Sequence, residues 1–145
     1  MHAYTYSGHP TCCAVALKNI EIMEKERLWE NAAKMGDRLY AGLQSAFKDH
    51  AHVGDIRGGK GLLAAIELVE DRGTKANFAA DRKVAPRIQA EMQKRGLVTR
   101  VRPTSGAHPA NGDQVFFAPP LVTTGEQIDR IVSTCRDALK AVLGV

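Results

Sequence analysis

The chain has 145 residues, which is enough for one domain with a sizeable core. Lysine and arginine (20 residues) exceed aspartate and glutamate (16 residues), so the formal net charge is +4. The charges are interspersed and aromatic residues make up only 6% of the chain, so we expect neither a nucleic-acid-binding face nor a base-stacking platform. We find no signal peptide and no apolar run of membrane-spanning length, so no membrane partner is expected.

The three cysteines, Cys12, Cys13 and Cys135, form no disulfide framework, because their number is odd and two of them are adjacent. This usage indicates a reducing compartment, and we expect a cytoplasmic protein. His9 lies close to Cys12 and Cys13, but no zinc-ligand spacing is repeated elsewhere. Small buried cysteines are therefore favoured over a metal site.

The first distinctive stretch is residues 4–10, Tyr-Thr-Tyr-Ser-Gly-His-Pro. Pro10 suits the first turn of a helix, and Gly8 permits a left-handed entry into that turn. The hydroxyl groups and free backbone donors before the helix would face its positive end, which is a seat for an anion such as a phosphate. On the residues alone, an ordinary cap and turn is the favoured interpretation.

Two helices are expected to follow, each with one apolar stripe. The stripe of the first helix, which begins at Pro10, consists of Cys13, Ala16, Leu17, Ile20 and Met23. A break near Glu26 and Arg27 precedes the second helix, whose stripe consists of Leu28, Ala32, Met35, Leu39, Leu43 and Phe47. We interpret both stripes as core-facing surfaces rather than as parts of a cofactor site.

Two strands are predicted next, with a glycine-rich run between them. An extended segment begins at residues 55–57, and Gly-Gly-Lys-Gly at residues 58–61 interrupts it. This run lacks the spacing and the following Ser or Thr of a P-loop, so a bulge or tight connection is favoured over a phosphate-binding loop. Residues 62–69 alternate and place on one face Leu62, Ala64, Ile66 and Leu68.

The rest of the chain alternates between helix and strand. After a polar surface loop at residues 71–80, Asp81 can cap a helix that stops at Gly96, and residues 97–101 have the pattern of a strand. Residues 104–113 predict a flexible loop, and residues 115–117 a short strand. Thr124 and Gln127 form a capping box for a last helix, with a stripe of Ile128, Ile131, Val132, Cys135, Leu139 and Val142.

This order of elements predicts an α+β fold, in which a small, mainly antiparallel sheet is covered by helices on one side. The strands are close in sequence and their connections are short, which favours antiparallel pairing. We treat residues 1–145 as a single domain with three parts: an N-terminal segment (1–9), helices (10–48) and an α+β body (53–145).

Three runs of the sequence resemble the class III (omega-type) aminotransferases, which are pyridoxal-phosphate enzymes of fold type I. They are residues 1–10, residues 54–68, and the series 96–100, 112–115 and 119–122. The resemblance covers nearly all of the chain and corresponds to the C-terminal (small) domain of the family. It implies a homodimer that transfers an amino group from an amine or omega-amino acid to a keto acid through pyridoxal phosphate.

The resemblance also implies roles for three residues. The family's threonine at the position of Thr5 hydrogen-bonds the cofactor phosphate of the neighbouring subunit, so residues 1–9 would be an interface segment. The aromatic residue at the position of Tyr4 lines that neighbour's substrate pocket. The arginine at the position of Arg100 pairs with a substrate carboxylate, which suits the planar fork of a guanidinium, and swings out when the substrate has none.

The resemblance implies that the lysine that forms the Schiff base and the carboxylate partner of the pyridinium nitrogen belong to a large domain upstream. None of the lysines of this chain lies in the family's lysine motif. We therefore expect no catalytic residue here, no cofactor bound by this polypeptide alone, and no activity without the large domain and a second subunit. Met1 would be an internal methionine of a longer protein, or the start of an isolated domain.

Alternatives stay open at this point. A freestanding, non-catalytic α+β interaction module would also lack the lysine, and a basic nucleic-acid binder is a distant third. Arg100 could simply be exposed, or could pair with Asp113. The family joins this arginine to the following Gly-Asp turn by a very short link, whereas residues 102–111 intervene here. That insertion bears on the substrate class more than on the fold.

Overall fold

A computed structural model describes residues 4–103 and 112–144. The elements follow in the order α1 (Pro10–Lys25), α2 (Leu28–Phe47), β1 (Val53–Arg57), β2 (Ala64–Leu68), a 3-10 turn η1 (Ala80–Arg82), α3 (Val84–Lys94), β3 (Arg100–Arg102), β4 (Asp113–Phe117) and α4 (Gly125–Leu143). Within the described ranges, no helix combines the length and the apolar character needed to cross a bilayer.

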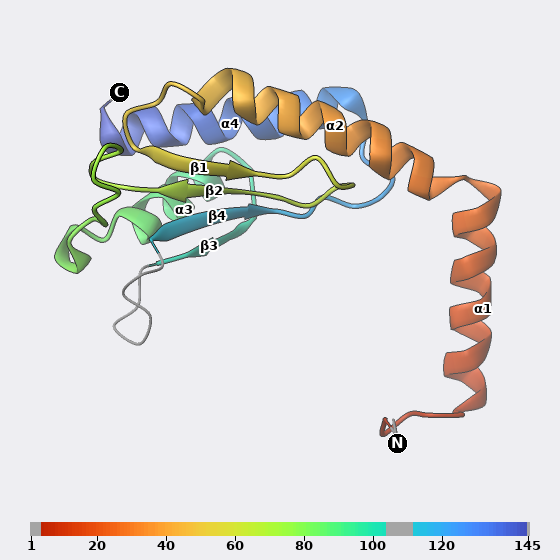
Figure 1. The fold of residues 1–145 in the computed structure, drawn as a ribbon. Coiled ribbons are helices and arrows are strands. Elements are labelled where there is room, and N and C mark those ends of the chain that lie inside the picture. The colour runs from red at the N-terminus through yellow and green to blue at the C-terminus, as the bar shows by residue number, and fades with distance from the viewer. Residues whose placement is uncertain (1–3, 104–111, 145) are drawn as a thin grey trace.

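The strands form one antiparallel sheet in the order β1-β2-β4-β3. Helices α2 and α4 lie side by side over one face of this sheet (Figure 1), and α3 packs against α4, β3 and β4. The other face, which we call the open face, carries none of the described helices. The predicted α+β architecture, with a small antiparallel sheet covered on one side, is confirmed.

The core lies between the sheet and helices α2, α3 and α4. Its completely buried side chains include Leu39, Leu43, Phe47, Ile66, Ile88, Met92, Val115, Ile128 and Leu139. The apolar stripe predicted for α2 lies in this core except for Leu28, which is only partly buried. Ile128, Cys135 and Leu139 of α4 lie there as well. The predicted capping box of α4 is also confirmed, since Thr124 and Gln127 each accept a backbone N–H from the other.

Helix α1 differs from the sequence-based prediction. Its apolar stripe was expected to face a core, but α1 has no buried residue. The chain turns at Arg27, whose φ of 51° is left-handed, at the predicted break, and α1 then projects away from the sheet (Figure 1). The periodicity identified the helix correctly, but periodicity does not say whether the covering surface belongs to the same chain.

Two predicted boundaries around α3 are wrong. Asp81 does not cap this helix: it lies in η1, and Lys83 is the N-cap with a left-handed φ of 48°. The Ala85 N–H donates instead to Oδ2 of Asp113, a buried residue of β4, at 3.1 Å. The strand expected at residues 97–101 begins only at Arg100, because residues 97–99 are not paired with β4 and Val98 is exposed.

The glycine-rich run at residues 58–61 lies against α2. A Cβ atom at Gly36 of α2 would overlap the carbonyl oxygen of Gly61, and one at Gly58 would come within 2.9 Å of the Tyr40 ring. Gly59 and Gly61 have positive φ values of 78° and 64°. The run is thus a tight connection between β1 and β2, as predicted, and close backbone packing on α2 fixes its position.

Replacing Gly36 by alanine is therefore expected to destabilise the chain. The new methyl group would meet a backbone oxygen that cannot rotate away, so we expect a loss of about 1–3 kcal/mol in the free energy of unfolding. Gly42→Ala is the matched control in the same helix, because its Cβ would meet a Val132 methyl group at 3.0 Å rather than backbone. Urea unfolding followed by circular dichroism measures both, and equal stabilities for the two variants would contradict this account of the loop.

The three thiols are expected to react very differently with an alkylating reagent. Burial raises the pKa of the Cys135 thiol to about 12. Cys12 and Cys13 are exposed on α1, so the expectation that they are buried is wrong. Because the thiolate is the reactive form, two thiols should be modified by iodoacetamide at pH 8 in the folded chain, and the third only in denaturant. Intact-mass spectrometry counts the adducts; rapid modification of Cys135 without denaturant would show that its site is open.

Candidate functional site

The open face of the sheet is built by strand alternation. Ile66 of β2 and Val115 of β4 are paired and lie in the core, so their neighbours point to the other side. The strand register then aligns one row across all four strands, in the order Arg57, Ala65, Phe116 and Arg100. A second row on the same face consists of Asp55, Glu67, Gln114 and Arg102.

A hollow of about 490 Å³ lies over part of the first row: Arg57, Ala65 and Phe116 line it, and Arg100 stands next to it, beyond Phe116. Its floor is apolar, since Ala65 has only a methyl group and stands between larger neighbours, with Phe116 on one side. Leu63 and Lys60 from the glycine-rich connection line it as well, and both are exposed. The size and the apolar lining suit the body of a small organic molecule, and the cationic residues that line the hollow are Arg57 and Lys60.

The two arginines of the first row differ in their partners. Arg57 contacts two carboxylates, Asp55 at 3.3 Å and Glu67 at 3.0 Å. Arg100 is exposed, and within residues 4–103 and 112–144 it makes no ion pair; its Cζ atom lies 5.9 Å from the centre of the Phe116 ring. A carboxylate brought to this face would therefore find the Arg100 guanidinium free of competing anions from the described chain.

Pairing of Arg100 with Asp113, which the sequence left open, is not found. Asp113 is three positions from Phe116 along β4, and therefore lies on the opposite, helix-covered face. There it is 6% exposed and accepts the Ala85 N–H. Of the insertion expected at residues 102–111, residues 104–111 lie outside the described part of the chain.

The N-terminal segment forms a turn before α1. Gly8 has a φ of 74°, and α1 begins at Pro10, as the sequence predicted. Ser7 does not cap the helix: its Oγ accepts the Tyr4 N–H at 3.0 Å, and the N-cap His9 makes no side-chain hydrogen bond. Tyr4 and Thr5 are both exposed, and Tyr4 has 78% of its surface accessible.

The structure does not bring the three predicted site residues together within one chain. Tyr4 and Thr5 precede α1, whose 16 residues span about 24 Å at 1.5 Å per residue. Arg100 lies in the sheet beyond the other end of α1 (Figure 1). Any site that uses all three residues must therefore combine groups from different chains.

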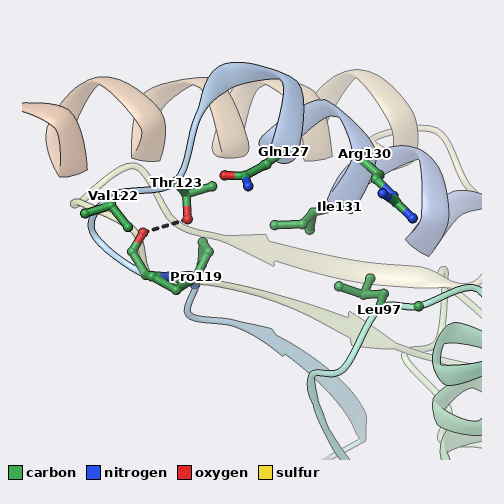
Figure 2. A pocket seen from close by; sticks show the side chains of 9 residues that line it. Leu97, Pro119, Val122, Thr123, Gln127, Arg130 and Ile131 are labelled. Carbon is green, nitrogen blue, oxygen red and sulfur yellow. Dashed lines mark hydrogen bonds between the residues drawn. The ribbon is translucent and has the colours of Figure 1, made fainter.

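A second hollow, of about 360 Å³, was missed at the sequence level. It lies between α4 and the segments that precede β3 and follow β4, and Figure 2 shows Leu97, Pro119 and Ile131 around it. Gln127 and Arg130 of α4 stand at its edge, and Thr123 Oγ1 donates to the Pro120 carbonyl at 2.6 Å. Its residues are far apart in sequence, so no local motif could have marked it.

Comparison with known proteins gives one family. The model described as Aminotransferase class-III matches residues 1–139. Diaminobutyrate–2-oxoglutarate transaminase of Halomonas elongata is 40% identical over 141 residues, which cover 97% of this chain and 28% of that protein. A probable gamma-aminobutyrate transaminase 3 of Oryza sativa subsp. indica, described as mitochondrial, is 36% identical over 97% of this chain and 25% of its own length.

Solved structures agree with the sequence comparison. The (S)-enantioselective omega-transaminase from Thermomicrobium roseum matches with a TM-score of 0.85 and 38% identity, over 99% of this chain and 30% of that one. The omega transaminase from Pseudomonas jessenii in complex with PMP matches with a TM-score of 0.83 and 41% identity, over 99% and 29%. The chain thus spans under a third of the length of the relatives it matches.

Proposed function

Because the chain belongs to the class III aminotransferases, we propose that it is the C-terminal part of an enzyme that moves an amino group from an amine or omega-amino acid to a keto acid. The cofactor of such an enzyme is pyridoxal phosphate, which supplies the electron sink for the amino transfer when bound. The observation that carries the proposal for this chain is the uncompensated guanidinium of Arg100 beside an apolar hollow on the open face.

Arg100 is proposed to bind the carboxylate of a substrate. Its fork of N–H donors matches the two oxygens of a carboxylate, and Arg100 is exposed on a strand at the sheet edge, where the side chain can move. Arg57 is a poorer candidate, because Asp55 and Glu67 already hold its guanidinium. The hollow over Ala65 would then receive the apolar part of the same substrate.

Thr5 is proposed to hold the phosphate of a cofactor bound by a second subunit, and Tyr4 to line that subunit's substrate pocket. The residues present fit an anion: Thr5 is exposed just before α1, and the first backbone N–H groups of a helix have no partners within the helix. The distance from Thr5 to the sheet along α1 supports a role in a neighbouring subunit, and hence a homodimer.

The chain by itself is proposed to be inactive. A Schiff-base lysine needs a partly desolvated pocket that lowers the pKa of its amine, but every lysine of this chain is exposed. The catalytic lysine is therefore expected in a large domain outside the chain.

The exposed, adjacent thiols of Cys12 and Cys13 further support a reducing compartment, and we keep the cytoplasm as the proposed location.

The test of inactivity is amino transfer by the purified chain with added pyridoxal phosphate. We expect no product above the cofactor-only control, because every lysine of the chain is exposed. A hybrid in which residues 4–144 replace the matching region of the Halomonas elongata enzyme should transaminate, because it regains the missing part. Turnover by the chain alone would overturn the proposal that it is only part of the catalytic unit.

Thr5 can be tested in the same hybrid. Loss of one hydrogen bond to a charged phosphate costs about 1.5–3 kcal/mol, so Thr5→Val should raise the dissociation constant of pyridoxal phosphate about tenfold or more. Thr11→Val is the matched control, since Thr11 is exposed on the first turn of α1 and no role is proposed for it. Equal cofactor affinity in the Thr5→Val and Thr11→Val hybrids would exclude the phosphate contact.

The exposed side chains of α1 predict self-association. Val15, Leu17 and Ile20 each expose at least half of their surface, and burying such a side chain contributes about 1.5–3 kcal/mol. The apparent mass of the chain in gel filtration should therefore rise with concentration, and Leu17→Glu with Ile20→Glu should keep it monomeric. A monodisperse parent chain at high concentration would favour the freestanding interaction module instead.

A further inference from the structure

Phe116 is the immediate neighbour of Arg100 on the open face. The two residues are direct cross-strand partners in the β4–β3 pair, and the Arg100 Cζ atom lies 5.9 Å from the centre of the Phe116 ring. The backbone at Phe116 is fixed, because its carbonyl oxygen accepts a hydrogen bond from the Thr99 hydroxyl. The ring thus projects from a hydrogen-bonded strand position next to a long, flexible cation.

The contact with the Phe116 ring matters because the described residues give Arg100 no ion-pair partner. Arg57, at the other end of the same row, is held by two carboxylates, whereas Arg100 has no ion-pair partner in residues 4–103 and 112–144. A free arginine side chain loses much rotamer freedom when it binds a ligand. An arginine that already rests over an aromatic ring has lost part of that freedom, and its in-plane N–H donors remain available to a carboxylate.

We infer that Phe116 is a positioning residue, which holds the Arg100 guanidinium over the open face and thereby strengthens the enzyme's preference for substrates that carry a carboxylate. This inference rests on the proposed role of Arg100 as carboxylate binder. It adds a residue that touches neither the cofactor nor the carboxylate. On the other side of the ring, Ala65 leaves the hollow open, so Phe116 separates the apolar part of the site from its cationic part.

The contact itself can be measured in the 145-residue chain by NMR. The ring current of Phe116 should shift the Arg100 Nε–Hε resonance, and Arg102, which faces Gln114, is the internal reference. Phe116→Leu should move the Arg100 resonance toward the Arg102 value, whereas Phe116→Tyr should leave it in place. An Arg100 resonance that does not change in Phe116→Leu would overturn the inference, whatever the kinetics show.

The functional consequence is measured in the active hybrid, with one omega-amino acid and one primary amine without a carboxylate as donors. Phe116 also lines the hollow, so the readout is the ratio of the two KM values: Phe116→Leu should raise KM for the omega-amino acid about two- to fivefold more than KM for the amine, which is the size of an exposed cation–π contact. Phe116→Tyr keeps the aromatic ring and should have the same KM values as the parent hybrid. In the Arg100→Met background, Phe116→Leu should not change the ratio of the two KM values any further.

The results distinguish failure of the inference about Phe116 from failure of the proposed role of Arg100. If Arg100→Met removes the preference for the carboxylate donor and Phe116→Leu does not weaken it, the inference fails and the proposed role of Arg100 stands. If Arg100→Met keeps the full preference, the proposed role of Arg100 fails, and the inference fails with it. An equal rise of KM for both donors in Phe116→Leu would mark a merely structural change and would also overturn the inference.

Discussion

The alternation of side chains along four antiparallel strands governs both the stability and the chemistry of this chain. One set of positions packs under α2, α3 and α4, and the next set faces away from every described helix. A shift of one residue in the β3–β4 register would bury Arg100 and expose Val101, so the core fixes the register. The same constraint places Asp113 on the covered face, where it serves α3, and leaves Arg100 without that carboxylate.

The sequence was sufficient for the architecture because the core-forming stripes are long and regular. The stripe of α2 and the alternation at residues 62–69 each carry several apolar positions, and Thr124 with Gln127 marks a helix start by local chemistry. The start of α3 was placed wrongly because the Ala85 N–H in its first turn donates to Asp113 of β4, 28 residues away in sequence. The late start of β3 has a similar cause, since strand pairing depends on the partner strand and not on the propensity of residues 97–99.

The candidate site also combines features that the sequence predicts with features that depend on contacts between distant residues. Thr5, Tyr4 and Arg100 were found by resemblance, and their surroundings could not be read from the residues. The hollow over Ala65, the ion pair of Arg57 with Glu67 and the contact of Phe116 with Arg100 all arise from cross-strand neighbours. The glycine-rich connection is another case: Gly58 lies against the Tyr40 ring of α2, and Gly59 and Gly61 have positive φ values, so the structure explains these glycines without a ligand.

The uncovered apolar stripe of helix α1 can be compared with the length of the matched relatives. A 16-residue helix without tertiary packing is only marginally stable in water, yet α1 keeps an apolar stripe that nothing in the described chain covers. The matched relatives are more than three times longer than the aligned region, so they contain ample chain to cover such a stripe. The uncovered stripe and the separation of Thr5 from Arg100 are both accounted for by the proposed function, in which Thr5 acts in a neighbouring subunit.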